Sequence, residues 1–146
     1  MRSPVVDIVP PEVRSFMMGR IRGRDTRAEL AVRSYLHRTG LRFKLNDRTL
    51  SGSPDVVLPR FRCVVFVNGC FWHRHPGCRF ATTPATRKEF WQAKFAANLA
   101  RDRRVHEDLR RMGWRPLVIW ECEIARPENV DELFWQIVAC EPKCNR

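Results

Sequence analysis

The hydrophobic positions of the chain recur with two periods, one typical of helices and one typical of strands. Apolar side chains between residues 28 and 36 are spaced as on one face of a helix. The residues Thr26-Arg27-Ala28-Glu29 have the form of a capping box, and Gly40 is the residue type that ends helices in a left-handed conformation. The pattern therefore predicts a helix from the Thr26 cap to just before Gly40, and a shorter helix over residues 12–21.

Four shorter segments have the patterns of strands. Residues 41–45 alternate apolar and basic side chains, as a strand with one exposed face does. Residues 55–58, which are apolar after Asp55, and the continuous apolar run of residues 63–67 predict two buried strands, and residues 114–121 predict a third. Residues 46–53 are rich in turn formers and are expected to connect the first two strands.

A long helix is predicted over residues 86–112, with Gly113 as its stop, and Pro127 begins a last helix that ends at Val138. The order of elements predicts a mixed α/β fold with helices flanking a central sheet. We expect one domain over residues 1–146, with residues 1–11 as a loose arm and 141–146 as a tail. The apolar face of the long helix is expected to comprise Phe90, Phe95, Leu99, Val105, Leu109 and Met112.

The charge of the chain indicates a polyanionic partner. The sequence has 27 Lys and Arg against 16 Asp and Glu, which gives a net charge of +11. Nearly all of the excess is arginine, whose planar fork matches phosphate oxygens and guanine edges. No apolar run is long enough for a membrane span, and no secretory signal is visible, so we expect a cytoplasmic protein. Nucleic acid is the expected partner.

Six cysteines in a reducing compartment indicate metal binding rather than disulfides. Cys70, His75 and Cys78 are spaced so that one loop can wrap a metal ion, and Cys122 ends a later strand. Three Cys and one His form the closed ligand set of a structural zinc site. His73 is an alternative ligand, and spacing alone does not separate it from His75. The other cysteines are assigned to no site, with the first expected in the core: Cys63, Cys140 and Cys144.

An acidic residue, Asp55, opens the first buried strand after a Ser/Gly turn. A carboxylate at the end of a sheet can hold Mg²⁺ against a phosphate, and such a cation assists phosphodiester hydrolysis. A Pro-Asp dipeptide by itself is a weak signal, because most are turns.

Several longer motifs change this picture, and with them the chain resembles the very short patch repair (Vsr) endonucleases. The similarity runs in order from about residue 18 to residue 122. It is carried by Pro54-Asp55, by Val65-Phe66-Val67-Asn68-Gly69-Cys70-Phe71-Trp72-His73, by Pro84-Ala85-Thr86-Arg87 with Glu89-Phe90-Trp91, by Asn98 with Arg101-Asp102-Arg103-Arg104, and by Gly113-Trp114-Arg115 leading to Trp120-Glu121-Cys122.

The resemblance implies a restriction-endonuclease-like core with a structural zinc site. It implies a Mg²⁺-dependent enzyme that nicks DNA 5′ to the T of a T·G mismatch left by deamination of 5-methylcytosine. The implied partner is double-stranded DNA with that mismatch, with general mismatch-repair factors and a DNA polymerase acting downstream. A monomer without membrane contact is expected, bound to the nucleoid when it is on DNA.

The resemblance also implies roles for individual residues. Asp55 matches the metal-binding aspartate, His73 the catalytic histidine, Asp102 the carboxylate that supports it, and Glu29 a further active-site acid. The usual threonine of the family is Val67 here, so a metal ligand at this position has to be the main-chain carbonyl.

Further matches concern zinc and DNA. The resemblance favours His75 over His73 as the zinc ligand. The implied zinc ligands are Cys70, His75, Cys78 and Cys122. The residues implied to wedge into the base stack are Phe71, Trp72 and Trp91, with Met18 and Ile21 entering from the opposite groove.

Other interpretations stay open from the sequence alone. A related restriction or repair endonuclease with a different site would share the core, and a non-catalytic zinc DNA-binding module would share the scaffold. Glu29 is also explained as part of a helix cap, and Asp102 as a counter-charge to its neighbouring arginines.

Overall fold

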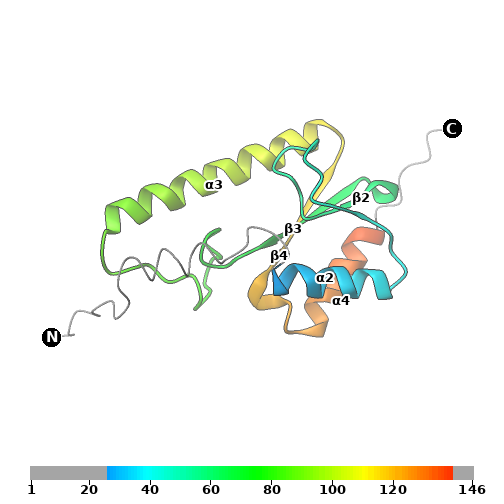
Figure 1. The fold of residues 1–146 in the computed structure, drawn as a ribbon, viewed down its shortest axis with the longest axis horizontal. Helices are drawn as coiled ribbons and strands as arrows, with labels where there is room; N and C mark the ends of the chain where they lie inside the picture. Colours follow the sequence, from blue (N-terminus) through cyan, green and yellow to red (C-terminus); the bar gives the residue numbers. More distant parts are fainter. Residues whose placement is uncertain (1–25, 140–146) are drawn as a thin grey trace.

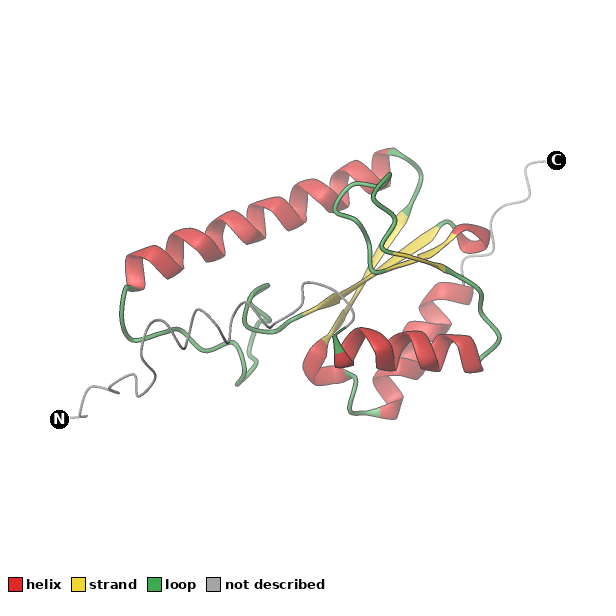
Figure 2. Cartoon of the chain, in the orientation of Figure 1, coloured by secondary structure: helices red, strands yellow, loops and turns green. Residues whose placement is uncertain are grey.

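The computed structural model describes residues 26–139. Within this range, three α-helices surround a four-stranded sheet, and they follow the predicted order of helix, three strands, helix, strand and helix (Figures 1 and 2). The predicted helix over residues 12–21 lies outside the described residues. The elements are α2 (Arg27–Arg38), β1 (Lys44–Leu45), β2 (Val56–Leu58), η1 (Pro59–Phe61), β3 (Cys63–Asn68), α3 (Lys88–Arg111), β4 (Arg115–Trp120), η2 (Glu121–Glu123) and α4 (Pro127–Val138).

The sheet is mixed, and its strand order is β1-β2-β3-β4. β1 pairs antiparallel with β2, and β2 with β3, where Leu58 faces Cys63 across a tight connection. Arg62 makes this connection possible with a left-handed φ of 50°. β3 and β4 are parallel, with Val65 paired to Leu117, and α3 is the crossover that parallel pairing requires.

The sheet has a separate hydrophobic core on each face, because successive strand residues point to opposite sides. α2 and α4 lie on one side of the sheet and α3 on the other (Figure 1). The hydroxyl of Tyr35 on α2 donates a hydrogen bond to Asp131 on α4. The first core comprises Val32, Leu36, Leu41, Val56, Leu58, Cys63, Val65, Ile119, Val130, Leu133 and Ile137, and the second comprises Leu50, Val57, Val64, Val105 and Leu109.

The predicted boundaries of α2 are confirmed. The hydroxyl of Thr26 accepts a hydrogen bond from the main-chain N–H of Glu29 at 3.2 Å, which caps the first turn. Gly40 follows the helix with a left-handed φ of 91°. Leu41 then turns back into the core, and its N–H donates to the carbonyl of Leu36 at 3.1 Å.

The strand expected over residues 41–45 is wrong in extent, and the burial expected for residues 114–121 is wrong. Only Lys44–Leu45 pairs as β1, because Leu41 belongs to the turn that closes the end of α2, where its N–H donates to the carbonyl of Leu36. β4 is a strand, but Ile119 is its only buried residue. The sheet order explains this, because β4 is an edge strand and is covered less than β3.

The helix α3 is longer than the sheet that it covers. Its C-terminal half packs on the sheet through Val105 and Leu109, and its N-terminal half extends past the strands toward the loop of residues 69–87 (Figure 1). Part of the predicted apolar face is therefore not covered, since Phe90 and Met112 are 44% and 49% exposed. None of the helices within residues 26–139 is long and apolar enough to cross a membrane.

Candidate active site and metal centre

The carboxylate of Asp55 lies at the start of β2, beside β3. The first residue of β2, Val56, pairs with Val65, so Asp55 and Val67 both lie beyond the last pair of this ladder. The main-chain N–H of Val67 donates to Asp55 Oδ2 at 2.7 Å. Burial raises the pKa of Asp55 from 3.8 to about 6, the hydrogen bond from Val67 opposes this change, and the charge of Glu29 adds to it. Asp55 is thus an acid whose charged form is costly without a cation beside it.

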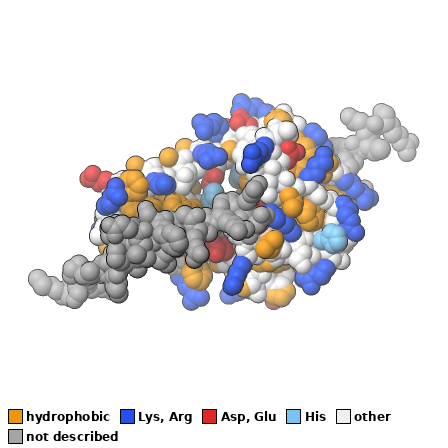
Figure 3. Space-filling model, viewed as in Figure 1, with side chains coloured by type: hydrophobic (Ala, Val, Ile, Leu, Met, Phe, Trp, Pro, Cys, Tyr) orange, Lys and Arg blue, Asp and Glu red, His pale blue; other side chains and the backbone are white. Residues whose placement is uncertain are grey.

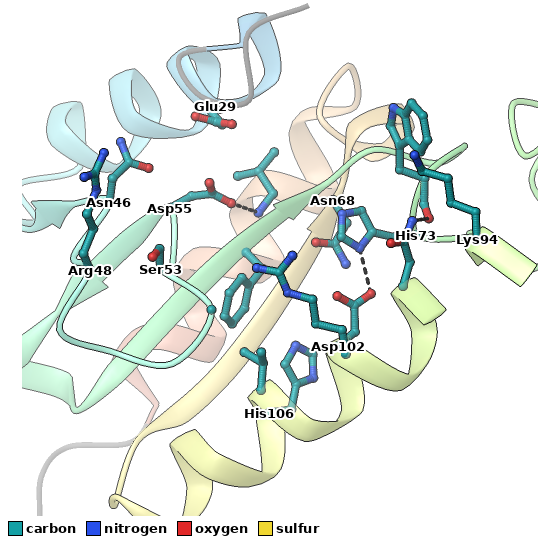
Figure 4. Close-up of a pocket in the computed structure, with 17 residues that line it drawn as sticks. Glu29, Asn46, Arg48, Ser53, Asp55, Asn68, His73, Lys94, Asp102 and His106 are labelled. Atoms are coloured by element: carbon teal, nitrogen blue, oxygen red, sulfur yellow. Dashed lines mark hydrogen bonds and ion pairs between the residues drawn. The ribbon is translucent and has the colours of Figure 1, made fainter. Parts of the chain in front are cut away.

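A second carboxylate, that of Glu29, faces Asp55 from α2 (Figure 4). Glu29 is only 4% exposed, and its Oε2 accepts a hydrogen bond from Arg33 Nη2 at 3.2 Å. The Thr26 half of the predicted capping box is present, and the side chain of Glu29 lines the same pocket as Asp55. The cap and a place in the pocket are therefore compatible.

A histidine–aspartate pair occupies the opposite side of this pocket. His73 Nδ1 lies 2.7 Å from Asp102 Oδ2, and the two side chains come from the loop after β3 and from α3 (Figure 4). One turn earlier on α3, Asn98 Nδ2 donates to the carbonyl of Trp72 at 3.3 Å, which ties the peptide next to His73 to the helix. Since Asp102 holds Nδ1, the other ring nitrogen, Nε2, remains available for proton exchange.

The acidic pair and the histidine–aspartate pair share one cleft of about 810 Å³. Its walls come from α2, the loop between β1 and β2, the end of β3, and α3. The cleft thus combines buried carboxylates, an oriented imidazole and basic side chains. The other polar or charged residues that line it are Asn46, Arg48, Ser53, Asn68, Lys94, Asn98, Arg101 and His106.

A cluster of metal-ligand side chains lies where β3 and β4 end. One ligand atom from each of Cys70, His75, Cys78 and Cys122 lies within 4.8 Å of all the others. His75 Nδ1 is 3.7 Å from Cys70 Sγ and 3.3 Å from Cys122 Sγ, and the sulfurs of Cys78 and Cys122 are 3.8 Å apart. Zinc–sulfur bonds of about 2.3 Å in a tetrahedron would separate the ligand atoms by about 3.8 Å. The donor set therefore fits a tetrahedral metal ion.

His75 is held in this orientation by its other neighbours. Its ring stacks on Trp120 at the end of β4, with centroids 4.3 Å apart and planes within 9°. Its Nε2 lies 3.9 Å from Glu123 Oε1, which leaves Nδ1 to face the cysteines. His73 is not in this cluster but lines the cleft that contains Asp55.

An aromatic cluster joins α3 to the loop of residues 69–87, called the metal loop because it carries three of the four clustered ligands. The ring of Phe71 packs edge-on against Trp72, Trp91 and Phe95, with centroid distances of 5.2, 5.6 and 5.3 Å. Trp72 and Trp91 are also in contact, at 5.9 Å. The structure thus brings together three of the expected wedge residues, and Met18 and Ile21 lie outside the described residues.

Known proteins are similar in sequence to this chain over most of its length. The family model described as DNA mismatch endonuclease Vsr matches residues 6–79. The type II nicking enzyme V.XorIIP of Xanthomonas oryzae is 46% identical over 121 residues, which is 83% of this chain and 88% of that protein. The DNA mismatch endonuclease Vsr of Escherichia coli is 41% identical over 128 residues, covering 88% of this chain and 81% of its own length. The type II nicking enzyme V.NmeAIP of Neisseria meningitidis is 37% identical, with 82% and 85% covered.

The chain belongs to the Vsr family of DNA mismatch endonucleases. The Vsr match covers residues that the structure brings together in the cleft and in the metal cluster, from Glu29 to Cys78. Relatives that span more than four fifths of the chain extend the relationship beyond this segment. Lys and Arg side chains are scattered over the face of this Vsr family member that Figure 3 shows, which suits the polyanionic substrate of a nuclease.

Asn68 and His106 are among the residues of this Vsr cleft to which the sequence pattern assigned no role. Asn68 ends β3 and is only 8% exposed, and it lies beside His73 (Figure 4). His106 follows Asp102 by one helical turn, and its ring lies 5.2 Å from that of Phe66. Burial lowers the pKa of His106. A spacing of four from Asp102 was the signal in the sequence that placed His106 on the same face of the helix.

Proposed function

We propose that this protein nicks one strand of double-stranded DNA 5′ to the T of a T·G mismatch left by 5-methylcytosine deamination, in a Mg²⁺-dependent reaction. The observation that carries the proposal is that Asp55 and the His73–Asp102 pair face one cleft. This combination offers a cation-binding carboxylate and an oriented base in the same space. The names of the relatives, which include a mismatch endonuclease and nicking enzymes, support the choice of substrate and of product.

The donors around Asp55 fit Mg²⁺, which prefers oxygen ligands. In an extended strand, the N–H and C=O of one residue point to the same side. Because the N–H of Val67 donates to Asp55, the carbonyl of Val67 is directed to that side as well. We therefore propose that Asp55 and the Val67 carbonyl hold the ion. A bound Mg²⁺ supplies charge stabilisation for the phosphate and lowers the pKa of bound water.

In the proposed reaction, His73 transfers protons. His73 Nε2 takes a proton from the attacking water or gives one to the leaving oxygen, and Asp102 fixes the tautomer through Nδ1. Glu29, which lines the same cleft from α2, would hold a water molecule or complete the ion's surroundings. Arginines on α3 that follow the cleft, such as Arg101, contact phosphates and set the register of the DNA.

A structural zinc ion is proposed for the cluster of Cys70, His75, Cys78 and Cys122. Three thiolates and one imidazole use all four positions of a tetrahedral ion, so none remains for a substrate. The ion would fasten the loop after β3 to the end of β4, and the aromatic residues Phe71 and Trp72 lie on that loop.

We propose a restriction-endonuclease-like core in a single unit of residues 1–146, which acts as a monomer in the bacterial cytoplasm and lies on the nucleoid when bound to DNA. The mixed sheet between helices supports such a core. The resulting nick would be passed to general mismatch-repair factors and a DNA polymerase.

One experiment tests this function against its alternatives. Purified protein is incubated with T·G, other-mismatch and matched duplexes, with and without Mg²⁺, and the products are mapped at nucleotide resolution. We expect one nick, 5′ to the mismatched T, only with Mg²⁺. A cut elsewhere would favour a restriction or repair endonuclease of different specificity, and binding without any cut would favour a zinc DNA-binding module.

A further inference from the structure

The side chains of three consecutive residues of the metal loop, residues 73–75, contact three different sets of partners. His73 contacts Asp102 across the active-site cleft, and His75 faces the sulfurs of the metal cluster. Arg74 lies between them with a left-handed φ of 56°. A non-glycine residue adopts this conformation only when its surroundings hold it there. The contacts of Arg74 therefore decide whether the residues on either side of it can reach their partners.

The guanidinium of Arg74 closes the loop that carries it. Nη1 donates to the carbonyls of Phe71 and Thr82 at 3.4 and 2.9 Å. Nη2 donates to the carbonyl of Ala81 and to the hydroxyl of Thr83, both at 3.0 Å. The start of the loop is thus joined to its end through one side chain.

The same group also fastens the loop to α3. The guanidinium carbon of Arg74 lies 4.0 Å from the ring centroid of Phe95, a buried residue of the helix. Among residues 26–139, no salt bridge includes Arg74. With four hydrogen bonds made inside the loop, it has only one of its five N–H donors left for a phosphate. These contacts distinguish Arg74 from the arginines on the surface.

We propose that Arg74 is a positioning residue for the nicking reaction, which holds His73 toward Asp102 independently of the metal cluster. The inference rests on the proposed function, because it assumes that His73 acts in the chemistry. The metal ion would fix residues 70, 75 and 78, whereas Arg74 fixes residue 71 and the segment 81–83. A displacement of about 1 Å at a reacting group is enough to slow catalysis by about a hundredfold.

The first test compares Arg74→Ala and Arg74→Lys with Arg79→Ala. Arg79 is the matched control, because it lies on the same loop and has the same charge but is exposed, with its guanidinium over Phe80 and no hydrogen bond within the described residues. Single-turnover nicking of a T·G duplex, DNA affinity and bound metal are measured for each variant. We expect Arg74→Ala to reduce the nicking rate by about 10- to 100-fold. We expect it to keep its metal and to bind DNA as tightly as the control.

Lysine should not restore the rate, since a single ammonium cannot reach acceptors on both ends of the loop. Equal nicking rates for Arg74→Ala and wild type, with wild type active, would overturn the inference and leave the proposed function intact. A wild type that does not nick would instead contradict the proposed function.

A second measurement keeps the test decisive if Arg74→Ala does not fold. Thr83→Val removes one of the four acceptors of the Arg74 guanidinium with little change in side-chain volume. It should reduce the nicking rate by a smaller factor than Arg74→Ala does. The ring ¹⁵N resonances of the four histidines report the geometry without any reaction. Thr83→Val and Arg74→Lys should shift the signals of His73 and leave those of His75 in place. Unchanged His73 signals, or equal changes at His73 and His75, would refute an independent role for Arg74.

Discussion

A buried carboxylate with a raised pKa destabilises the protein around it at neutral pH. The folded state of this protein binds the proton of Asp55 more tightly than the unfolded state, because its pKa is about 6 when folded and 3.8 otherwise. The stabilising contribution of the protonated group is therefore complete below pH 3.8 and is lost as the pH rises through about 6. Asp55 thus lowers stability at the pH where the enzyme is expected to work.

Asp55→Asn should therefore abolish nicking and stabilise the protein. At pH 7.5 without Mg²⁺, we expect a gain of about 1–3 kcal/mol, since two pKa units correspond to about 2.7 kcal/mol and the amide replaces the carboxylate imperfectly. Urea unfolding at pH 5 and pH 7.5, without chelators, should show the gain growing with pH. Mg²⁺ should stabilise the wild type only. A variant that is less stable than wild type at pH 7.5 would contradict the expected cost of the charge.

His73→Ala tests the assignment of the two neighbouring histidines. Loss of the base should slow single-turnover nicking by about 10²- to 10⁴-fold, while DNA affinity stays near that of the wild type. The metal content should not change, because His75 and not His73 lies in the cysteine cluster. Metal analysis of the purified variant is the check, and His75→Ala is the matched comparison that should lose the ion.

At the scale of elements, the loop between β1 and β2 is pressed against α3. Leu50 lies in the second core, Ser51 Oγ donates to Asp108 Oδ2 at 3.3 Å, and Gly52 approaches Val105 closely. A Cβ on Gly52 would overlap Val105 Cγ1 and lie 3.1 Å from Cγ2. This loop leads directly into Asp55, and both Gly52 and Val105 line the cleft that contains the carboxylate.

Gly52→Ala should destabilise the protein by about 2–4 kcal/mol, from backbone strain at a φ of 74° combined with overlap. Gly40→Ala is the control, because its φ is 91° and no atom lies within 4 Å of the added Cβ. It should lose only about 1 kcal/mol from strain. Thermal unfolding measures both, and adding Val105→Ala to Gly52→Ala should recover the overlap part. Equal losses at the two glycines would show that the loop yields freely.

The metal loop joins elements that the chain separates widely. Cys122→Ala should unfold or aggregate the protein, because removing a ligand of a structural ion removes free energy of folding. Cys140→Ala is the comparison and should leave metal content and thermal stability unchanged. Metal analysis and unfolding curves of both variants are the measurements, and a stable, metal-free Cys122→Ala protein would exclude a structural ion.

At the scale of the whole molecule, mismatch preference is expected to come from the aromatic cluster. Trp72→Ala should weaken binding to a T·G duplex more than binding to a matched one, because unstacking a wobble pair costs less and stacking on the ring recovers about 1–3 kcal/mol per base. The salt dependence of binding should stay the same, since it reports phosphate contacts. Competition binding at several salt concentrations tests this. Equal losses on both duplexes would identify Trp72 as a structural residue.

The main elements followed from the sequence because their signals are local. The buried strands, the Thr26 cap and the stop at Gly40 each depend on a few neighbouring residues, and the structure confirms them. Errors arose where burial depends on distant neighbours. No local pattern reveals that β4 is an edge strand or that α3 extends past the sheet near Phe90.

The site residues show the same division. The spacing indicated a metal loop with Cys70, Cys78 and one of two histidines, whereas the choice of His75 over His73 relied on resemblance to a family. The positions of Asn68 and Arg74 could not be anticipated. Both depend on how a loop folds back, Asn68 on the cleft that forms beside β3 and Arg74 on carbonyls up to eight residues away.

The parallel pairing of β3 with β4 has a consequence for the order in which the chain folds. Cys63 pairs with Arg115, roughly fifty residues later, so this contact forms only after a costly loop closure. During synthesis, the short segment of residues 70–78 emerges well before Cys122, and it already holds three of the four ligands. An ion bound early by this segment would later bind Cys122 and so bring the end of β4 to the loop. The refolding rate of this protein should therefore depend on the concentration of free zinc.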